Sequence, residues 1–371
     1  MTQLKVPLIS VIIPCYNYAR FLPAAIDSVL SQQCAALDVE IIVVDDGSTD
    51  NTSHVAKQYD GRIHYLFQKN QGLSAARNTG MRAAHGDYLL FLDADDLLSA
   101  GNLERHLLHF ARRPELDISV CLCLLTADPF AHPPMCSLWP LKAHHLDLHL
   151  CYANISPVHT FLIRTNAARA CGFFNEDLKA CEDQDYWLRC AAMGQHFGSM
   201  GETYVWYVQH NDSLSSKRSE QPKHDIEMQF SISHMLESLP AFPRAGKYLG
   251  WLAHASGALG SAIGAFTLLP DLAQKLLTEC GLALLKAMVE PKIHTHDKYL
   301  AIAEEYYASK FFAVGKEDIR LLPPTLQKAL NFLRRKFPHL ASVDATVLAQ
   351  KREKLFQKLC CNVSTRFTPI K

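Results

Sequence analysis

The chain has 371 residues, of which 49% are hydrophobic and 20% charged, and its formal net charge is zero. This composition is that of a globular protein with enough residues for one large domain and a smaller one. A neutral chain has no overall attraction to nucleic acid, so we expect no nucleic-acid partner. The composition indicates no particular oligomeric state.

Strand-like and helix-like segments alternate through the first third of the chain. Apolar and β-branched runs predict the strands, and apolar residues at helical spacing predict the helices between them. Such alternation is typical of a mostly parallel sheet flanked by helices. The predicted strands cover residues 8–13, 41–44, 62–67, 88–92 and 118–125, and the predicted helices residues 24–30, 51–59, 73–84 and 103–112.

The pattern breaks between residues 127 and 157, where prolines and histidines predict a loop-rich insertion. Strand signals return at residues 158–163 and 204–208, with a helix predicted over residues 182–193. Helical patterns predominate after residue 221. We therefore predict an α/β domain over residues 1–221 and an α-helical C-terminal domain over residues 222–371.

The C-terminal region raises the question of a membrane. Residues 249–269 are long enough to span a bilayer and contain a Gly-x-x-x-Gly spacing, but polar side chains within them favour a buried helix of a helical domain. Residues 320–371 carry eleven lysines and arginines against two acids. This excess predicts peripheral contact with an anionic membrane or a glycolipid, and a solvated basic face is the commoner alternative.

The twelve cysteines are scattered and show no zinc-ligand spacing. The residues before the first predicted strand are too few and too polar for a signal peptide. We therefore expect reduced thiols in a cytoplasmic protein, with the inner membrane face as a possible place of peripheral contact.

Acidic residues directly follow two predicted strands. Asp45 and Asp46 end the strand over residues 41–44, and Asp93 and Asp95 follow the strand over residues 88–92. Because parallel strands bring their carboxyl ends to one edge of a sheet, we expect these side chains to lie together. Crowded carboxylates repel each other unless a cation or protons neutralise them. The pattern predicts an enzyme that binds Mg²⁺ or Mn²⁺ beside a phosphate-bearing ligand.

Other residues near these acids are suited to a nucleotide. Pro14 and Tyr16 follow the first strand and offer a flat apolar surface for a base, while Asp46 can accept hydrogen bonds from base N–H groups. The alternative is that the Asp-Gly-Ser segment is only a strand-to-helix turn. Arg77 stands among small residues on a predicted helix, where a cation can approach a ligand, and an ordinary surface arginine is its alternative.

Five motifs, in this order, closely resemble those of the family 2 glycosyltransferases with the GT-A fold. They are Pro-x-Tyr-Asn at residues 14–17, Asp-Asp-Gly-Ser at 45–48, Gly-Leu-Ser-Ala-Ala-Arg-Asn at 72–78, Asp-x-Asp at 93–95 and Glu-Asp at 182–183. Each motif alone is weak, but the ordered set in its strand context is strong. The resemblance covers residues 8–215 and implies a GT-A type, Rossmann-like sheet. The helical tail is not covered.

The resemblance also implies the ligands. The donor would be a nucleoside diphosphate sugar, with UDP as the expected nucleotide, and the metal would be Mg²⁺ or Mn²⁺. His210 resembles the family's late histidine near the metal, although a lone loop histidine is usually solvated. The implied donor-binding residues are Pro14, Tyr16, Asn17, Asp46, Arg77, Asp93 and Ala94, and the implied metal-binding residues are Asp93, Asp95 and His210.

The same resemblance implies that Asp183 is the general base, which removes the acceptor hydroxyl proton as its oxygen attacks the anomeric carbon. Asp185 is the competing candidate. The acids at the start of this helix could instead only favour its dipole. The residues expected to support the acceptor side are Glu182, Asp185, Trp187 and His159, with Trp187 more often a core residue than a sugar platform.

Two departures qualify the resemblance. Residues 172–176 read Gly-Phe-Phe-Asn-Glu where many relatives have Gly-Gly-Phe-Asp-Glu, and the chain lacks the Gln-x-x-Arg-Trp signature of processive synthases. The expected function is inverting, metal-assisted transfer of a single sugar to a hydroxyl of a glycan or glycolipid acceptor in surface-polysaccharide biosynthesis. The alternatives are a nucleotide-sugar-binding protein without catalysis and a nucleotidyltransferase, although the phosphate loop of the latter is missing.

Overall fold

The computed structural model describes residues 6–127, 136–138, 145–210, 221–239, 242–243, 247–265, 268–290, 297–312 and 322–359. Their contacts divide the chain into two compact units. The first contains residues 1–144 and 156–216, and the second contains residues 145–155 and 217–360. The change of unit at residue 217 lies close to the predicted boundary, whereas the membership of residues 145–155 in the second unit has no counterpart in the sequence prediction.

The strands described in the first unit form one mixed sheet in the order β3-β2-β1-β4-β8-β6-β9-β5, with β7 beside β6. β1 to β4 pair in parallel, as the alternating pattern predicts. β8 is antiparallel to both β4 and β6, and therefore interrupts the parallel order. The strands are β1 (Leu8–Cys15), β2 (Asp38–Asp45), β3 (His64–Phe67), β4 (Tyr88–Phe91), β5 (Leu97–Leu98), β6 (Ile118–Thr126), β7 (Cys136–Leu138), β8 (Phe161–Arg164) and β9 (Phe197–Val208).

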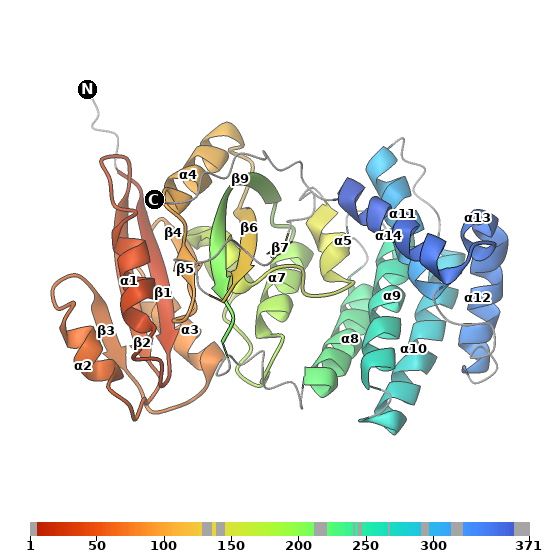
Figure 1. Cartoon of the computed structure of the whole chain (residues 1–371), viewed down its shortest axis with the longest axis horizontal. Coiled ribbons are helices and arrows are strands. Elements are labelled where there is room, and N and C mark those ends of the chain that lie inside the picture. The colour runs from red at the N-terminus through yellow and green to blue at the C-terminus, as the bar shows by residue number, and fades with distance from the viewer. Residues whose placement is uncertain are drawn as a thin grey trace. The chain divides into compact units, whose positions relative to one another are not determined.

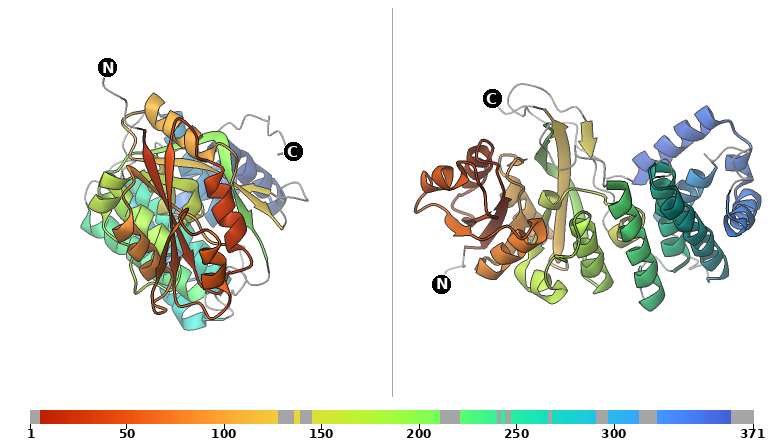
Figure 2. Two further views of the ribbon diagram at one scale, coloured as in Figure 1. Left: turned by 90° about the vertical axis from the view of Figure 1, so that its left-hand side faces the viewer. Right: turned by 90° about the horizontal axis from the view of Figure 1, so that it is seen from below.

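Helices flank this sheet (Figures 1 and 2). β1 is buried along almost its whole length, which explains why its sequence is a continuous apolar run rather than an alternating one. The segment over residues 158–163, predicted as one strand, divides into the short 3₁₀ helix η2 (Val158–Thr160) and β8. The helices of this unit are α1 (Leu22–Leu30), α2 (Thr52–Lys57), α3 (Leu73–Ala83), α4 (Asn102–Arg112), α6 (Thr165–Cys171) and α7 (Glu182–Ala192).

The described elements of the second unit are all helical, as predicted. α8, α9 and α10 lie side by side (Figure 1). No helix in the described ranges is both long enough and apolar enough to cross a membrane. The helices are α5 (Leu146–Leu150), α8 (Gln221–Ser238), α9 (Lys247–Ala265), α10 (Pro270–Val289), α11 (Lys298–Phe311), α12 (Pro324–Lys336), α13 (Pro338–Ala341) and α14 (Ala345–Leu359).

Buried hydrogen bonds attach α5 to the helices of the second unit. His149 is 1% exposed, and its Nε2 lies 2.6 Å from the hydroxyl of Tyr299, while its Nδ1 contacts the hydroxyl of Tyr307. Both tyrosines belong to α11. A buried imidazole needs partners of this kind, so the pairing explains why a segment predicted as a loop is ordered within this unit.

A glycine allows α9 to approach the chain after α5. A Cβ atom added to Gly257 would lie 2.0 Å from the carbonyl oxygen of Tyr152, which is far inside contact distance. Gly260, almost one turn further along the same helix, would place its Cβ in open space. The two glycines therefore have the same low helix propensity but different packing.

We expect Gly257→Ala to destabilise the protein by about 1–3 kcal/mol, because the added methyl group forces the helix away from its neighbour. Gly260→Ala should be neutral or stabilising by up to about 1 kcal/mol, because alanine has the better helix propensity. Urea unfolding of both variants measures the difference. Equal effects of the two substitutions would contradict the close approach.

Candidate donor-binding and catalytic site

Three parallel strands end at one edge of the sheet. β1 pairs with β2 on one side and with β4 on the other, with Cys15 opposite Asp45 and Ile12 opposite Phe91. A cavity of about 360 Å³ opens at this edge. The sequence-predicted residues that line it are Pro14, Tyr16, Asp46, Asp93, Ala94, Asp95 and Glu182.

Tyr16 is 46% exposed, so part of its ring is available in this cavity. Asp46, by contrast, is 4% exposed and binds the chain before α3. Its Oδ1 accepts hydrogen bonds from Gln68 Nε2 at 2.8 Å and from the amide of Gln71 at 2.9 Å, and its Oδ2 accepts one from the amide of Gly72 at 2.8 Å. Asp46 therefore shapes the wall of the cavity as well as lining it.

Asn17 joins the loops that follow β1 and β2. Its backbone is left-handed, with φ at 59°, and its side-chain oxygen accepts hydrogen bonds from the amides of Thr49 at 2.7 Å and Asp50 at 3.3 Å. Its own amide donates to the hydroxyl of Ser48. These contacts explain an asparagine at this position without a ligand, so the predicted donor contact of Asn17 stays a prediction.

Arg77 is buried between two acids from distant parts of the sequence. The residue is 2% exposed, its Nη2 lies 2.9 Å from Asp93 Oδ1, and its Nη1 lies 2.6 Å from Glu182 Oε1. Burial alone would favour the neutral form, but the charges of Asp93 and Glu182 raise the pKa of Arg77. The alternative of an ordinary surface arginine is therefore wrong, and the predicted donor contact of Arg77 stays a prediction, because Arg77 is not one of the residues that line the cavity. Arg77 connects the end of β4 to the start of α7.

Asp95 faces His210, as the metal prediction requires. Nε2 of His210 lies 2.9 Å from Asp95 Oδ2, and the imidazole stacks on Phe21 with ring centroids 4.3 Å apart. Burial, and then the charge of Asp93, raise the pKa of Asp95. A carboxylate oxygen and an imidazole nitrogen at this distance could ligate one divalent ion. The rest of the predicted histidine motif, residues 211–215, lies outside the described residues.

Asp96 and His159 form a buried layer behind these acids. Asp96 Oδ1 accepts a hydrogen bond from the amide of Val208 at 2.8 Å, and Oδ2 lies 3.2 Å from Nδ1 of His159. Asp93, Asp96 and His159 have ligand atoms within 4.8 Å of one another, so they form a second candidate metal cluster. An acceptor residue should be exposed in a cavity, whereas His159 is fully buried. Burial lowers the pKa of His159 to about 4.

The acids at the start of α7 have different surroundings. Glu182 is bound to Arg77, and Asp185 Oδ2 lies 2.9 Å from Nε of Arg189, whose Nη1 also donates to the carbonyl oxygen of Cys171. Asp185 is therefore part of a structural contact between α6 and α7. Asp183 is the most exposed of the three. This arrangement favours Asp183 over Asp185 as the candidate base.

Trp187 belongs to the core. It is fully buried and stacks on Phe161 of β8, with ring centroids 4.2 Å apart. It therefore anchors α7 as a core residue, the commoner of the two roles expected for it. Its ring has no exposed face for a sugar.

The loop of residues 172–176 is held at Phe174 and Glu176, two positions where it agrees with the relatives. The side-chain nitrogen of Asn78 donates to the carbonyl oxygen of Phe174 and to Glu176 Oε1, and Asn78 Oδ1 accepts from the amide of Phe174. Phe174 stacks on Tyr186 of α7. Asn78 thus ties this loop to α3, and Glu176 lines the cavity.

Sequence reasoning missed several residues of the cavity wall. Asn70 and Lys179 lie beside motif positions but carry no pattern of their own, and Tyr207 reads as an ordinary strand residue. Their place becomes visible only when the edge of the sheet is assembled.

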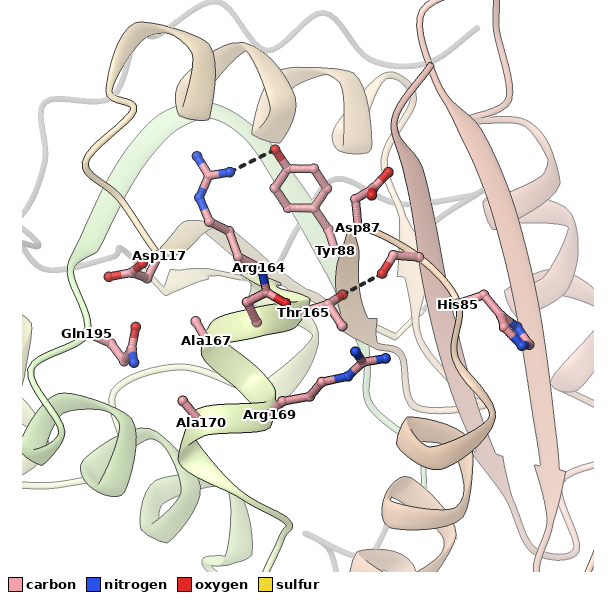
Figure 3. A pocket seen from close by; sticks show the side chains of 12 residues that line it. His85, Asp87, Tyr88, Asp117, Arg164, Thr165, Ala167, Arg169, Ala170 and Gln195 are labelled. Carbon is pink, nitrogen blue, oxygen red and sulfur yellow. Dashed lines mark hydrogen bonds between the residues drawn. The ribbon is translucent and has the colours of Figure 1, made fainter. Parts of the chain in front are cut away.

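A second, larger cavity of about 620 Å³ lies at the opposite end of β4 (Figure 3). Arg164 donates to the hydroxyl of Tyr88 there, and Thr165 donates to the carbonyl oxygen of Gly86 at 2.6 Å. These polar groups complete contacts within the fold. We place the functional site at the smaller cavity, because that one has the convergent acids and an exposed aromatic ring.

The parallel strands that end in acids, together with the antiparallel β8, define an α/β domain of the GT-A type. Residues 10–172 match the family described as Glycosyl transferase family 2. Residues 10–172 therefore carry the match to this family that the motifs predict, over somewhat less than half of the chain.

The chain is similar to other proteins over different lengths. It is 33% identical over 221 residues to the uncharacterized glycosyltransferase EpsJ of Bacillus subtilis. The aligned region covers 57% of this chain and 63% of that protein. The chain spans about three fifths of the length of the first curated relatives that it matches.

Two solved structures share its fold. TarS 1–349 of S. aureus, in complex with UDP-GlcNAc, has a TM-score of 0.55 at 17% identity and covers 98% of this chain and 94% of that chain. The mannosyltransferase PcManGT of Pyrobaculum calidifontis, in complex with GDP-Man and Mn²⁺, has a TM-score of 0.51 at 18% identity and covers 89% of this chain and 86% of that chain.

The ion pairs of Arg77 lead to a stability prediction. Arg77→Met should destabilise the protein by about 3–5 kcal/mol, because it leaves Asp93 and Glu182 without their buried cation. Arg82 lies on the same helix and is 54% exposed, with its nearest carboxylate oxygen on Glu176 at 4.0 Å. Arg82→Met should change stability by less than about 0.5 kcal/mol. Thermal and urea unfolding compare the stabilities of the two variants. A small loss of stability in Arg77→Met would contradict a structural role for its two ion pairs.

Proposed function

We propose that this chain is an inverting glycosyltransferase that moves one sugar from a nucleoside diphosphate sugar to an acceptor hydroxyl. The observation that carries the proposal is the shared cavity, in which a partly exposed Tyr16 and the acids that follow β2 and β4 lie together. The ring can stack on a base, and the acids can bind a diphosphate through a metal. The family match supports the reaction class.

We propose UDP as the nucleotide and a divalent cation as the cofactor. Asp95 and His210 would hold the ion, which would supply positive charge for the leaving diphosphate. A donor set that includes an imidazole suits Mn²⁺ better than Mg²⁺, which prefers oxygen ligands and ordered water. The solved PcManGT structure contains Mn²⁺, which is consistent with this choice for a related fold.

Asp183 is the proposed base. Asp183 is partly exposed and directly follows Glu182, which lines the cavity, whereas Asp183 is not one of the lining residues. A carboxylate so placed could take the acceptor proton as the sugar is transferred, while the bond to the diphosphate breaks on the opposite face. Inversion at the anomeric carbon follows from a single displacement of this kind.

The first experiment is a binding and hydrolysis panel of UDP, GDP and dTDP sugars with and without Mn²⁺. We expect one donor to bind in a metal-dependent way and Asp95→Ala to abolish that binding. Asp183→Asn should retain donor binding and lower kcat by about 10²–10⁴-fold, because it removes the general base. Asp185→Asn is the matched variant and should keep turnover.

The outcomes separate the alternatives. Loss of turnover in Asp185→Asn alone would assign the base to Asp185. Donor binding without turnover across a set of acceptors would indicate a nucleotide-sugar-binding protein. Absence of metal-dependent binding to every sugar nucleotide would overturn the proposal.

We further propose that the acceptor is a glycan or glycolipid and that the chain makes peripheral contact with an anionic membrane. α12 and α14 carry eight basic side chains against the single acid Glu353, a local excess of positive charge, although Lys336 pairs with Glu304 of α11. An anionic surface attracts such helices by about 1 kcal/mol per basic residue. The basic residues are Lys328, Arg334, Arg335, Lys336, Lys351, Arg352, Lys354 and Lys358.

Vesicle cosedimentation tests this contact. The wild-type protein should bind vesicles that contain phosphatidylglycerol and not vesicles of phosphatidylcholine, and binding should weaken with salt. Replacing Lys354 and Lys358 by glutamate should release it. Equal binding to both vesicle types, or no effect of the two substitutions, would contradict an electrostatic membrane contact.

A further inference from the structure

A series of contacts behind the candidate metal pair begins at His159. This residue lies in η2 and is fully buried, and its ring is parallel to that of Tyr207, with centroids 6.0 Å apart. Its Nδ1 lies 3.2 Å from Asp96 Oδ2 and 3.9 Å from Asp93 Oδ2. The described residues offer neither ring nitrogen a well-aligned hydrogen bond. The imidazole therefore faces two acids of the site without another polar contact.

Other buried histidines of the chain are different. His106 is also fully buried, but its Nδ1 lies 2.8 Å from the hydroxyl of Ser119, away from the acids. His149 has a tyrosine hydroxyl beside each ring nitrogen. Each of those two imidazoles has at least one ring nitrogen beside a neutral hydroxyl group of the fold, although Nε2 of His106 has no hydrogen-bond partner among the described residues. An imidazole without such partners is costly to bury, which indicates that the position of His159 serves the acids that it faces.

Asp96 connects His159 to the end of β9. One of its oxygens faces His159, and the other accepts the hydrogen bond from the amide of Val208, the last residue of β9. His210 follows two residues later and reaches Asp95. Asp96 therefore lies between His159 and the amide of Val208, and its hydrogen bond connects the turn after β4 to the end of β9.

We propose that His159 is a positioning residue that, through Asp96, holds Asp95 and His210 at the separation needed to bind one divalent ion. The inference rests on the proposed function, since it concerns the metal of that site. In this proposal His159 acts through Asp96, and a role as a ligand in its cluster with Asp93 and Asp96 is the competing explanation. The Nδ1 atom is the part that matters, because it is the atom that faces the carboxylates.

Two substitutions separate the nitrogen from the ring. His159→Phe keeps a ring of similar size beside Tyr207 but loses the nitrogen that faces Asp96. His159→Asn loses the ring but can place its amide group near the former Nδ1. The readout is the Mn²⁺ concentration that gives half-maximal binding of UDP, measured by calorimetry on the full chain together with circular dichroism to confirm folding.

We expect His159→Phe to raise the Mn²⁺ midpoint by about 10- to 100-fold, the usual effect of removing a partner behind metal ligands, and His159→Asn to raise it by less than about threefold. His106→Phe is the matched control, since it also replaces a fully buried histidine of the first unit, and it should leave the midpoint unchanged. A general effect of replacing a buried histidine would shift the midpoint of the two phenylalanine variants alike.

Three results would overturn the inference. One is an unchanged Mn²⁺ midpoint in His159→Phe. Another is an equal shift in His159→Phe and His106→Phe. The third is a wild-type protein that holds a second Mn²⁺ which His159→Phe removes, since His159 would then be a ligand. A wild-type protein that binds neither UDP nor GDP with Mn²⁺ contradicts the proposed function itself, which distinguishes that failure from the others.

Discussion

The arrangement of the site depends on one buried cation. The guanidinium group of Arg77 contacts Asp93 at the end of β4 and Glu182 at the start of α7, two positions far apart in the sequence. A buried charge without a partner is strongly unfavourable, so the strand end and the helix start are held together. Asp183 follows Glu182 directly. The place of the candidate base relative to the acids after β4 is thus a consequence of the ion pairs that Arg77 makes with Asp93 and Glu182.

The acids of the motifs divide into two groups. Some are bound to groups of the fold: Asp45 accepts hydrogen bonds from the amide of Ser48 and the hydroxyl of Tyr65, and Asp185 pairs with Arg189. Others, such as Asp95 and Asp183, are more exposed. Two adjacent acids in the sequence can therefore have unrelated roles. Acids that bind groups of the fold hold the backbone in place. Neighbouring acids on that backbone are then free to face a ligand.

Sequence patterns predicted the parallel strands and the acids at their ends, because period and strand polarity are local properties. They could not predict the antiparallel β8 between β4 and β6, which depends on pairing across distant segments. The burial of Arg77 was also hidden, since its partner Glu182 is 105 positions away. His159 was expected beside an acceptor and lies instead behind Asp96, because a lone histidine carries no signal of the direction it faces.

The hydrogen bonds of Asp46 change how a variant of that residue can be interpreted. Its carboxylate orders residues 68–72, which precede α3, the helix that carries Arg77. An Asp46 variant that no longer binds nucleotide would lose the shape of one wall as well as any contact with the base. If Asp46 also contacts the base, as the motif predicts, recognition of the base and rigidity of this wall would depend on a single carboxylate, and a substitution there would affect both.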